Sequence, residues 1–383
     1  MVEKQFVERF GGGGEIRLVR APGRVNLIGE HTDYNDGFVC PMAIEPQVMI
    51  ACRKRDDRVV RIASTAFPND VTEFSLAWPI TRGEPSWGNY MRGVTAELLE
   101  AKIPLVGMDA LYTQTLPVGG GLSSSAAIEI GTGLALLSLS GVDLDRMRLA
   151  LLCQKAEQIY AQVPCGLMDQ MIVATAVAGH ATLFDCRTQE KTLVPIDPAD
   201  VRVVICNSMV KHALTGGEYA QRRAQCEAGA AFFRRSDPRI YALRDVAIEQ
   251  IDAAVGHLDD TIIRRCRHVV TENQRCMEAA AALRERRYHE AGKLMLQSHA
   301  SLRDDYEVSI AELDFLVEQA MEVDGVYGAR LTGGGFGGCI VVLCKPSVST
   351  TLMDSLRKKY RERYGIDAEA FVTTATAGTS VVR

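Results

Sequence analysis

A run of three glycines and three serines, set between a strand-like and a helix-like segment, constrains this chain more than any other feature. The run is Pro-Val-Gly-Gly-Gly-Leu-Ser-Ser-Ser-Ala-Ala at residues 117–127; residues 108–116 alternate like a strand, and residues 123–137 are rich in Ala and Leu. Glycines let backbone amides approach a ligand closely, and the first amides of a helix lack intrahelical partners and carry partial positive charge. The segment therefore predicts an anion site suited to phosphate.

Two familiar glycine-rich loops do not fit this segment. No Gly-Lys-Ser/Thr follows the glycines, which excludes a Walker A loop, and Ser124 stands where a dinucleotide-binding loop has its third glycine. The alternative is a glycine-rich turn with a serine helix cap and no ligand. Three successive serines and two alanines after the glycines favour phosphate binding over that alternative.

A second glycine-rich segment, Gly-Gly-Gly-Phe-Gly-Gly, lies at residues 333–338. It satisfies G-x-G-x-x-G, but residues 339–343 are typical of a buried strand, whereas a dinucleotide site needs a helix there. A protein-kinase glycine loop would be followed by a catalytic loop and a metal-binding aspartate, for which too few residues remain. We predict a tight hairpin between two strands, whose glycines also let it approach a ligand.

Residues 21–37 hold an unusual density of polar side chains between glycines. Glu30, His31 and Asp33 follow one another closely. Sugar hydroxyls are recognised by carboxylate, imidazole and amide groups in fixed directions, and this segment supplies such groups. Metal binding is the alternative, but the Glu-His-x-Asp spacing matches no established zinc site. We predict polyol binding here and a solvated position for Asp36.

Two carboxylates farther along the chain are candidates for the chemistry. Asp169 lies in an apolar helical segment at residues 167–177. Beside a guanidinium such as Arg24 its ionised form would be favoured, which suits a group that faces a hydroxyl nucleophile. Taken alone, Asp169 fits better as a surface residue or as a favourable charge in a first helical turn. Glu157 is a candidate magnesium ligand, with a solvated surface position as the alternative.

The chain has 383 residues, more than one hydrophobic core usually organises, so we expect two domains. The first half mixes strand-like and helical segments, and the second half is rich in helical periodicity and returns to strands at its end. Pro195 and Pro198 interrupt the pattern, and we expect domains at residues 1–190 and 191–383. The predicted fold class is α+β, with a mixed α/β N-terminal domain and a helix-rich α+β C-terminal domain.

Charge and cysteine usage exclude several classes of protein. The 43 basic residues are outnumbered by 48 acidic residues, so we expect no nucleic-acid partner. The 11 cysteines are scattered without a C-x-x-C pair, which indicates reduced thiols in a cytosolic protein. The N-terminus lacks the apolar core of a signal peptide, and residues 126–142 are too short and polar to cross a bilayer. We therefore expect a cytoplasmic protein without a membrane partner.

The polar segment, the glycine–serine run and the second glycine-rich segment, in this order along the chain, resemble those of the galactokinases, a family of the GHMP small-molecule kinase superfamily. APGRVNLIGEHTDYNDGFV resembles the galactokinase signature, LPVGGGLSSSAA the superfamily's phosphate loop, and LTGGGFGG its third, glycine-rich motif. The likeness extends through CGLMDQ, GGEYAQRRAQCE and HASLRDDYEVS, and so covers nearly the whole chain. Leu167 and Gly120 stand where the family often has Ile and Ala, and neither departure removes a functional group.

The resemblance implies ATP- and Mg²⁺-dependent phosphorylation of the anomeric hydroxyl of galactose, with the active site in the cleft between the two domains. Asp169 matches the catalytic aspartate and Arg24 its charged partner. The positions that match galactose-binding residues are Glu30, His31, Asp33, Gly166 and Tyr219. The positions that match the ATP site are Trp87, Gly119, Gly120, Gly121, Leu122, Ser123, Ser124 and Ser125. The positions that match magnesium ligands are Glu157 and Ser125, with Ser124 as the alternative serine.

Some alternatives stay open on the sequence alone. Trp87 fits a position near adenine, and it also fits an ordinary packing tryptophan. A kinase for a related sugar, such as N-acetylgalactosamine or arabinose, would carry similar motifs. A non-catalytic sensor of sugar and nucleotide is a further alternative, against which the intact serine run, Asp169 and Arg24 all argue. We expect the protein to be a monomer.

Overall fold

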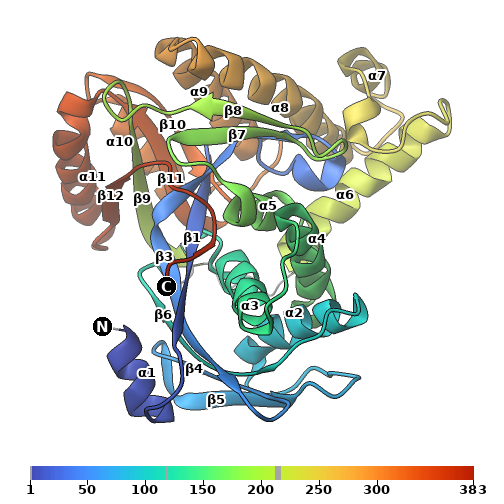
Figure 1. The fold of residues 1–383 in the computed structure, drawn as a ribbon. Helices are drawn as coiled ribbons and strands as arrows, with labels where there is room; N and C mark the ends of the chain where they lie inside the picture. The colour runs from blue at the N-terminus through green and yellow to red at the C-terminus, as the bar shows by residue number, and fades with distance from the viewer. Residues whose placement is uncertain (1, 118–119, 212–216) are drawn as a thin grey trace.

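The computed structural model of the protein describes residues 2–117, 120–211 and 217–383 (Figure 1). The predicted site residue Gly119 lies outside these ranges. The helices are α1 (Val2–Phe10), α2 (Asn89–Glu100), α3 (Ser124–Ser140), α4 (Arg146–Ala156), α5 (Met168–Thr175), α6 (Gly217–Arg234), α7 (Ile248–Ala253), α8 (Asp260–Arg284), α9 (Tyr288–Asp304), α10 (Ala311–Met321) and α11 (Ser349–Tyr364). The strands are β1 (Arg17–Asn26), β2 (Phe38–Val39), β3 (Pro41–Arg55), β4 (Val59–Ser64), β5 (Phe67–Ser75), β6 (Gly107–Gln114), β7 (His180–Asp185), β8 (Lys191–Pro195), β9 (Arg202–Lys211), β10 (Val326–Thr332), β11 (Gly337–Cys344), β12 (Glu369–Thr373) and β13 (Ser380–Val381).

The largest sheet has six strands in the order β13-β1-β3-β6-β4-β5. Most neighbours are antiparallel, as in the long pairing of β1 with β3, whereas β4 runs parallel to β6. Helix α3 packs on β1 and β3, and α2, α4 and α5 surround it. Helix α1 buries Phe6 against Ala51 and Leu111. The sheet therefore supports the helix that follows the glycine–serine run.

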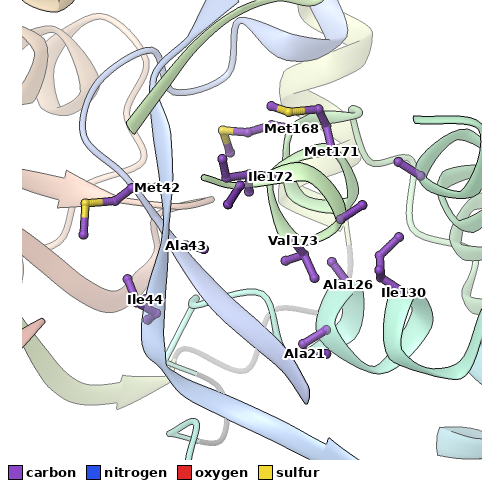
Figure 2. Close-up of a cluster of buried hydrophobic side chains, with 14 of the residues drawn as sticks. Ala21, Met42, Ala43, Ile44, Ala126, Ile130, Met168, Met171, Ile172 and Val173 are labelled. Atoms are coloured by element: carbon purple, nitrogen blue, oxygen red, sulfur yellow. The ribbon is translucent and has the colours of Figure 1, made fainter. Parts of the chain in front are cut away.

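An apolar seam joins the helices that carry the candidate site to this sheet. Figure 2 shows α5 and α3 directing apolar side chains toward β1 and β3. The side chains that it labels are Ala21, Met42, Ala43, Ile44, Ala126, Ile130, Met168, Met171, Ile172 and Val173, and all are buried. Burial of each larger side chain in this set stabilises the fold by roughly 1.5–3 kcal/mol. The seam thereby holds the first turns of α3 and α5 in place.

A four-stranded sheet in the order β10-β11-β9-β12 organises much of the second half. Successive residues of β9 and β11 point to opposite faces of a sheet. Val204 and Val342 belong to the core shared with α10 and α11, whereas Val203 and Val341 belong to the larger cluster that continues into the first half. Both faces are covered, which explains why residues 339–343 are a continuous apolar run.

The ends of the chain and a small third sheet link the two halves. Strands β2, β7 and β8 form the third sheet, with Phe38 opposite Asp185. Strand β13 returns to the first sheet, where Val381 pairs with Val19. This return was not predicted, because a two-residue strand has too few residues to show a period. No helix in the described ranges has the length and apolarity that a bilayer-spanning helix requires.

Most predicted elements are confirmed, and the exceptions have local causes. Helix α4 is α-helical only to Ala156, and the chain continues as a π-helical turn, Glu157–Ala161, that the sequence did not predict. Such turns are rare and occur frequently at functional sites. Strand β5 was missed because nearly all of its side chains are exposed, so it lacks the alternation of a half-buried strand. The observed mixture of helices and sheets is α+β, as predicted.

Candidate active site

A cavity of about 510 Å³ lies where both halves of the chain contribute its walls. It brings together segments that are far apart in the sequence: the polar segment after β1, the glycine–serine run, the start of α5, the start of α6 and the second glycine-rich turn. The predicted site residues that line it are Arg24, Glu30, His31, Asp33, Gly120, Gly121, Leu122, Ser123, Ser124, Ser125, Glu157, Gly166, Asp169 and Tyr219.

Arg24 and Asp169 form a bidentate ion pair on the wall of this cavity. Arg24 Nε donates to Asp169 Oδ1 at 2.6 Å, and Nη2 donates to Oδ2 at 2.7 Å. Its third nitrogen, Nη1, donates to the carbonyl oxygen of Gly121 at 2.6 Å. Burial acts to lower the pKa of Arg24, but the neighbouring carboxylates, Asp169 first, outweigh it and raise that pKa. The guanidinium therefore stays charged and orients a carboxylate whose side chain is still 26% exposed.

The glycine–serine run forms the strand–turn–helix that its pattern predicts. It follows β6 and leads into α3, which begins at Ser124. Ser124 and Ser125 line the cavity at the N-terminal end of α3, where the backbone amides lack intrahelical acceptors. Ser123 occupies the cap position, but within the described residues its hydroxyl makes no capping bond to α3. The start of α3 therefore faces the cavity as the predicted anion site requires, and the serine-cap alternative does not describe how Ser123 is used.

The second glycine-rich segment is the predicted hairpin between β10 and β11. Its glycines lie against the backbone of the first run: a Cβ on Gly333 would lie 3.0 Å from the oxygen of Gly121, and one on Gly338 3.1 Å from the oxygen of Gly120. Cys339 Sγ donates to that same oxygen of Gly120 at 2.9 Å. The two glycine-rich turns are therefore packed backbone to backbone, with little room for a Cβ at Gly333 or Gly338.

We expect Gly338→Ala to weaken ATP use more than it weakens the fold. Gly338 has φ +79°, and an added Cβ would press on Gly120 in the phosphate-site turn. We expect kcat/KM for ATP to fall at least about tenfold, since small displacements of a positioning loop are costly. Gly365→Ala is the matched control, because it has φ +71° and open space around the added Cβ. A Gly338→Ala enzyme no worse with ATP than this control would contradict the prediction.

Glu30 is buried and tied to the second glycine-rich turn. Its Oε1 accepts from the amide of Gly333 at 2.6 Å, and its Oε2 lies 3.0 Å from Nη1 of Arg330. The side-chain Nδ2 of Asn26 also donates to Oε2. Burial raises the pKa of Glu30, while the positive charge of Arg330 opposes this shift. The structure thus gives Glu30 a structural role at the cavity wall. The sequence did not predict this role, because no pattern around Arg330 indicates that it is buried and paired with Glu30.

His31 lines the cavity, and two tyrosine hydroxyls lie behind its ring. Its Nδ1 is 2.8 Å from Tyr34 Oη, which is 2.8 Å from Tyr306 Oη. Its Nε2 is buried and has no hydrogen-bond partner within the described residues. Burial, with the nearby His268, lowers the pKa of His31 to about 3, so the ring is neutral at physiological pH. Tyr34 and Tyr306 lie within two of the motifs that resemble galactokinases. The sequence did not predict them as site residues, because no local pattern shows that their side chains are in contact.

Asp33 lies directly against Gly166 in the same cavity. A Cβ on Gly166 would stand 1.9 Å from Oδ2 of Asp33, so only glycine leaves room for this carboxylate. Burial, with the added repulsion of Asp169, raises the pKa of Asp33 to about 6. Tyr219, half-buried at the start of α6, completes this wall 5.7 Å from the ring of His31. These predicted sugar-site residues therefore form one surface.

The raised pKa of Asp33 predicts that replacing this carboxyl makes the protein more stable at neutral pH and weakens its use of sugar. The pKa of Asp33 is about 6 in the folded state and about 3.9 in the unfolded state, so the folded state keeps the proton to a higher pH. This group therefore stabilises the fold below that range, and its contribution is lost as the pH rises through 6. At pH 7.5 we expect Asp33→Asn to raise the free energy of unfolding by about 1–3 kcal/mol and to raise the KM for sugar at least about tenfold.

Urea denaturation and steady-state kinetics at pH 7.5 test this prediction. Asp143→Asn, at an exposed position, is the control and should change the unfolding free energy by less than about 0.5 kcal/mol. An Asp33→Asn protein that is less stable than the wild type at pH 7.5 would contradict the prediction.

Glu157 and Ser125 supply oxygen donors that suit a divalent cation. Glu157 accepts from Gln170 Nε2 at 2.5 Å, and the same amide donates to Glu129 at 3.0 Å. Burial raises the pKa of Glu157, the negative charge of Asp169 adds to this shift, and hydrogen bonding to Ser125 opposes it. A hard cation would relieve this repulsion, so these residues fit Mg²⁺. Within the described ranges no cluster of three or more His, Cys, Asp or Glu forms a ready metal site, so phosphate and water oxygens would complete the coordination.

Trp87 is not among the residues that line the cavity. Its ring stacks on Phe67 with centroids 5.6 Å apart and an interplanar angle of 9°. Its Nε1 is buried without a hydrogen-bond partner in the part of the chain that the structure describes. A position near adenine therefore stays a prediction, and the packing alternative matches the contacts seen here.

Family models match three parts of the chain. Residues 4–54 match the galactokinase galactose-binding signature, residues 89–177 the GHMP kinases N terminal domain, and residues 279–362 the GHMP kinases C terminal domain. A galactokinase from Chloroflexus aggregans is 47% identical over 376 residues, which cover 98% of this chain and 96% of that protein. This chain belongs to the galactokinase family. A galactokinase from Chloroflexus aurantiacus is 45% identical with the same coverage.

Solved structures agree with this family. The crystal structure of Lactococcus lactis galactokinase complexed with galactose superposes with a TM-score of 0.94 at 35% identity, and covers 99% of this chain and 98% of that one. The Methanococcus jannaschii mevalonate kinase superposes with a TM-score of 0.65 at 17% identity, covering 95% of this chain and 100% of that one, which shows the shared fold alone. The predicted two-domain GHMP kinase fold is confirmed, and the protein is a kinase of this family.

Proposed function

We propose that this galactokinase transfers the γ-phosphoryl group of ATP to the anomeric hydroxyl of galactose, giving galactose 1-phosphate and ADP. One observation carries the proposal: the Arg24–Asp169 pair stands between the polar wall of His31 and Asp33 and the serine end of the phosphate-site turn. A sugar on one side and a triphosphate on the other would meet at this carboxylate.

Asp169 would orient the sugar hydroxyl and accept its proton as the oxygen attacks phosphorus. A positioned carboxylate of this kind contributes roughly 10²–10⁴-fold to the rate. Arg24 would hold the ionised carboxylate in place and offset negative charge that develops on the transferred phosphoryl group. Because phosphoryl transfer needs mainly positioning and charge stabilisation, this pair and the backbone amides at the start of α3 supply most of what the chain must provide.

The sugar would be held by the polar residues of the cavity wall that the galactokinase signature supplies. His31 lines this wall, and its neutral ring has nitrogens of the kind that can donate to or accept from a sugar hydroxyl. Asp33 offers carboxylate oxygens, and Gly166 leaves the space that this carboxylate occupies. Tyr219 and Glu30 complete the predicted set, with Glu30 mainly fixing the segment to the second glycine-rich turn.

The nucleotide would lie on the glycine–serine run with Mg²⁺. Ser125, or Ser124 in its place, and Glu157 would hold the cation, which when bound offsets charge on the phosphates. Gly120, Gly121, Leu122, Ser124 and Ser125 would surround the phosphates. Adenine would lie toward Trp87, whose ring stacks on Phe67.

An ADP-release assay with ATP, Mg²⁺ and a panel of monosaccharides tests the proposal. We expect galactose to give the highest kcat/KM and N-acetylgalactosamine and arabinose to give far lower values. A higher value with another sugar would reassign the substrate. Binding of galactose and ATP without ADP release would instead identify a sensor.

We also propose that the chain divides into domains at residues 1–190 and 191–383, acts as a monomer and works in the cytoplasm. The six-stranded and four-stranded sheets support the division, although β13 returns to the first sheet. All 11 cysteines are free thiols, which suits a reducing compartment. Light scattering during gel filtration tests the monomer, and limited proteolysis near residues 187–200 tests the boundary.

A further inference from the structure

Ser123 lies at the cap of α3, yet its side chain serves another residue. Its hydroxyl donates to Oδ2 of Asp169, the oxygen that also accepts from Arg24 Nη2. A serine at a helix cap usually accepts a bond from a backbone amide of the first turn. Here, within the described part of the chain, it makes no such bond. The hydroxyl therefore points away from the helix and into the cavity wall.

The backbone of Ser123 is in a conformation that side chains seldom adopt. Its φ is +58° and its ψ +50°, in the left-handed region. This region is strained for an L-residue and costs glycine little. Gly121, two residues earlier, has φ +70°, so the same turn uses glycine at another position with a left-handed backbone. A serine held in a glycine conformation, with its hydroxyl on the candidate catalytic carboxylate, indicates that the hydroxyl has a function.

We propose that Ser123 is a positioning residue for Asp169 and not a phosphate-binding residue, an inference that rests on the proposed phosphoryl transfer. With Arg24 on both carboxylate oxygens and Ser123 on one of them, the plane of the carboxylate is fixed. Oδ1, which Ser123 leaves free, is then the oxygen better placed to accept a proton from the sugar. Ser124 and Ser125, which begin α3, remain for the phosphates and the cation.

The proposal predicts that loss of the Ser123 hydroxyl lowers kcat and leaves the KM for ATP nearly unchanged. Two substitutions at this position distinguish the effect of the hydroxyl from the effect of the strained backbone. Ser123→Gly removes the hydroxyl and suits the left-handed conformation, whereas Ser123→Ala removes the hydroxyl and keeps the strain. We expect both variants to lose roughly 10–100-fold in kcat, the value of one charge-assisted hydrogen bond. We expect the KM for ATP to change less than about twofold in both, since a positioning group does not bind the nucleotide.

Ser124→Ala is the matched control, because Ser124 is the next residue and lines the same cavity. We expect this variant to raise the KM for ATP more than either Ser123 variant does. A Ser123→Gly enzyme with wild-type kcat, or one whose KM for ATP rises tenfold at unchanged kcat, would overturn the proposal. Thermal melting should show that Ser123→Gly is folded. A wild-type enzyme inactive on every sugar would instead refute the proposed function itself, so the two failures are distinguishable.

Discussion

Replacing Asp169 by asparagine is expected to lower kcat at least about 10³-fold and to leave the protein folded. Asparagine keeps the shape of the side chain but cannot accept the sugar proton at neutral pH, and a general base is worth up to about 10⁴-fold. It also removes the charge that faces Arg24 at 2.6 Å and 2.7 Å. Steady-state ADP release measures the loss, and circular dichroism with ATP binding measures whether fold and nucleotide site survive.

A second bidentate pair in this chain provides the matched control. Asp185 accepts from both Nη1 and Nη2 of Arg244, outside the residues that line the cavity. Asp185→Asn therefore removes the same type of ion pair without touching the proposed chemistry. We expect it to cost stability and to change kcat by less than about threefold. Asp169→Asn turnover above a tenth of the wild-type value would remove Asp169 from the mechanism.

Replacing Arg330 by methionine is expected to destabilise the protein by about 3–5 kcal/mol, the usual cost of breaking a buried ion pair by removing one partner. Arg330 is fully buried and Glu30 is 2% exposed, with Nη1 and Oε2 3.0 Å apart. Methionine leaves the Glu30 carboxylate buried beside the second glycine-rich turn. Because burial already raises the pKa of Glu30, the remaining carboxyl can take up a proton, and the loss should shrink as the pH falls.

Urea denaturation at pH 7.5 and at about pH 5.5 measures this effect. Lys359→Met removes the same charge from an exposed pair, since Lys359 and Glu322 are 35% and 57% exposed. We expect this control to cost less than about 1 kcal/mol at either pH. An Arg330→Met protein as stable as the control would show that the Glu30–Arg330 pair does not hold the sugar segment to the glycine hairpin. That outcome would leave the proposed chemistry at Asp169 unaffected.

The two experiments address different parts of one arrangement. Asp169 is tested by rate, because its contribution is made to the reacting oxygen. Arg330 is tested by stability, because it lies behind the cavity and acts on the position of Glu30. A loss of sugar use in Arg330→Met that follows its loss of stability would be expected, since His31 adjoins Glu30 in the same segment.

The sequence by itself determined the local structure that the site needs. The strand, glycine–serine turn and helix at residues 108–137 were predicted because alternation, glycine and helix-forming residues act within a few residues of one another. The hairpin at residues 333–338 was predicted for the same reason and is confirmed. The motifs also led to the correct family, because each combines residue types that ordinary folding does not require together.

Only the tertiary structure decided how these segments meet. Arg24 and Asp169 are 145 positions apart, and Glu30 and the amide of Gly333 are 303 apart, so no local pattern relates them. The structure also placed the Ser123 hydroxyl on Asp169, packed Trp87 on Phe67, and paired the last strand with β1. Such contacts depend on how sheets and helices pack over the whole core, and packing is a property of the assembled chain, not of any short stretch of it.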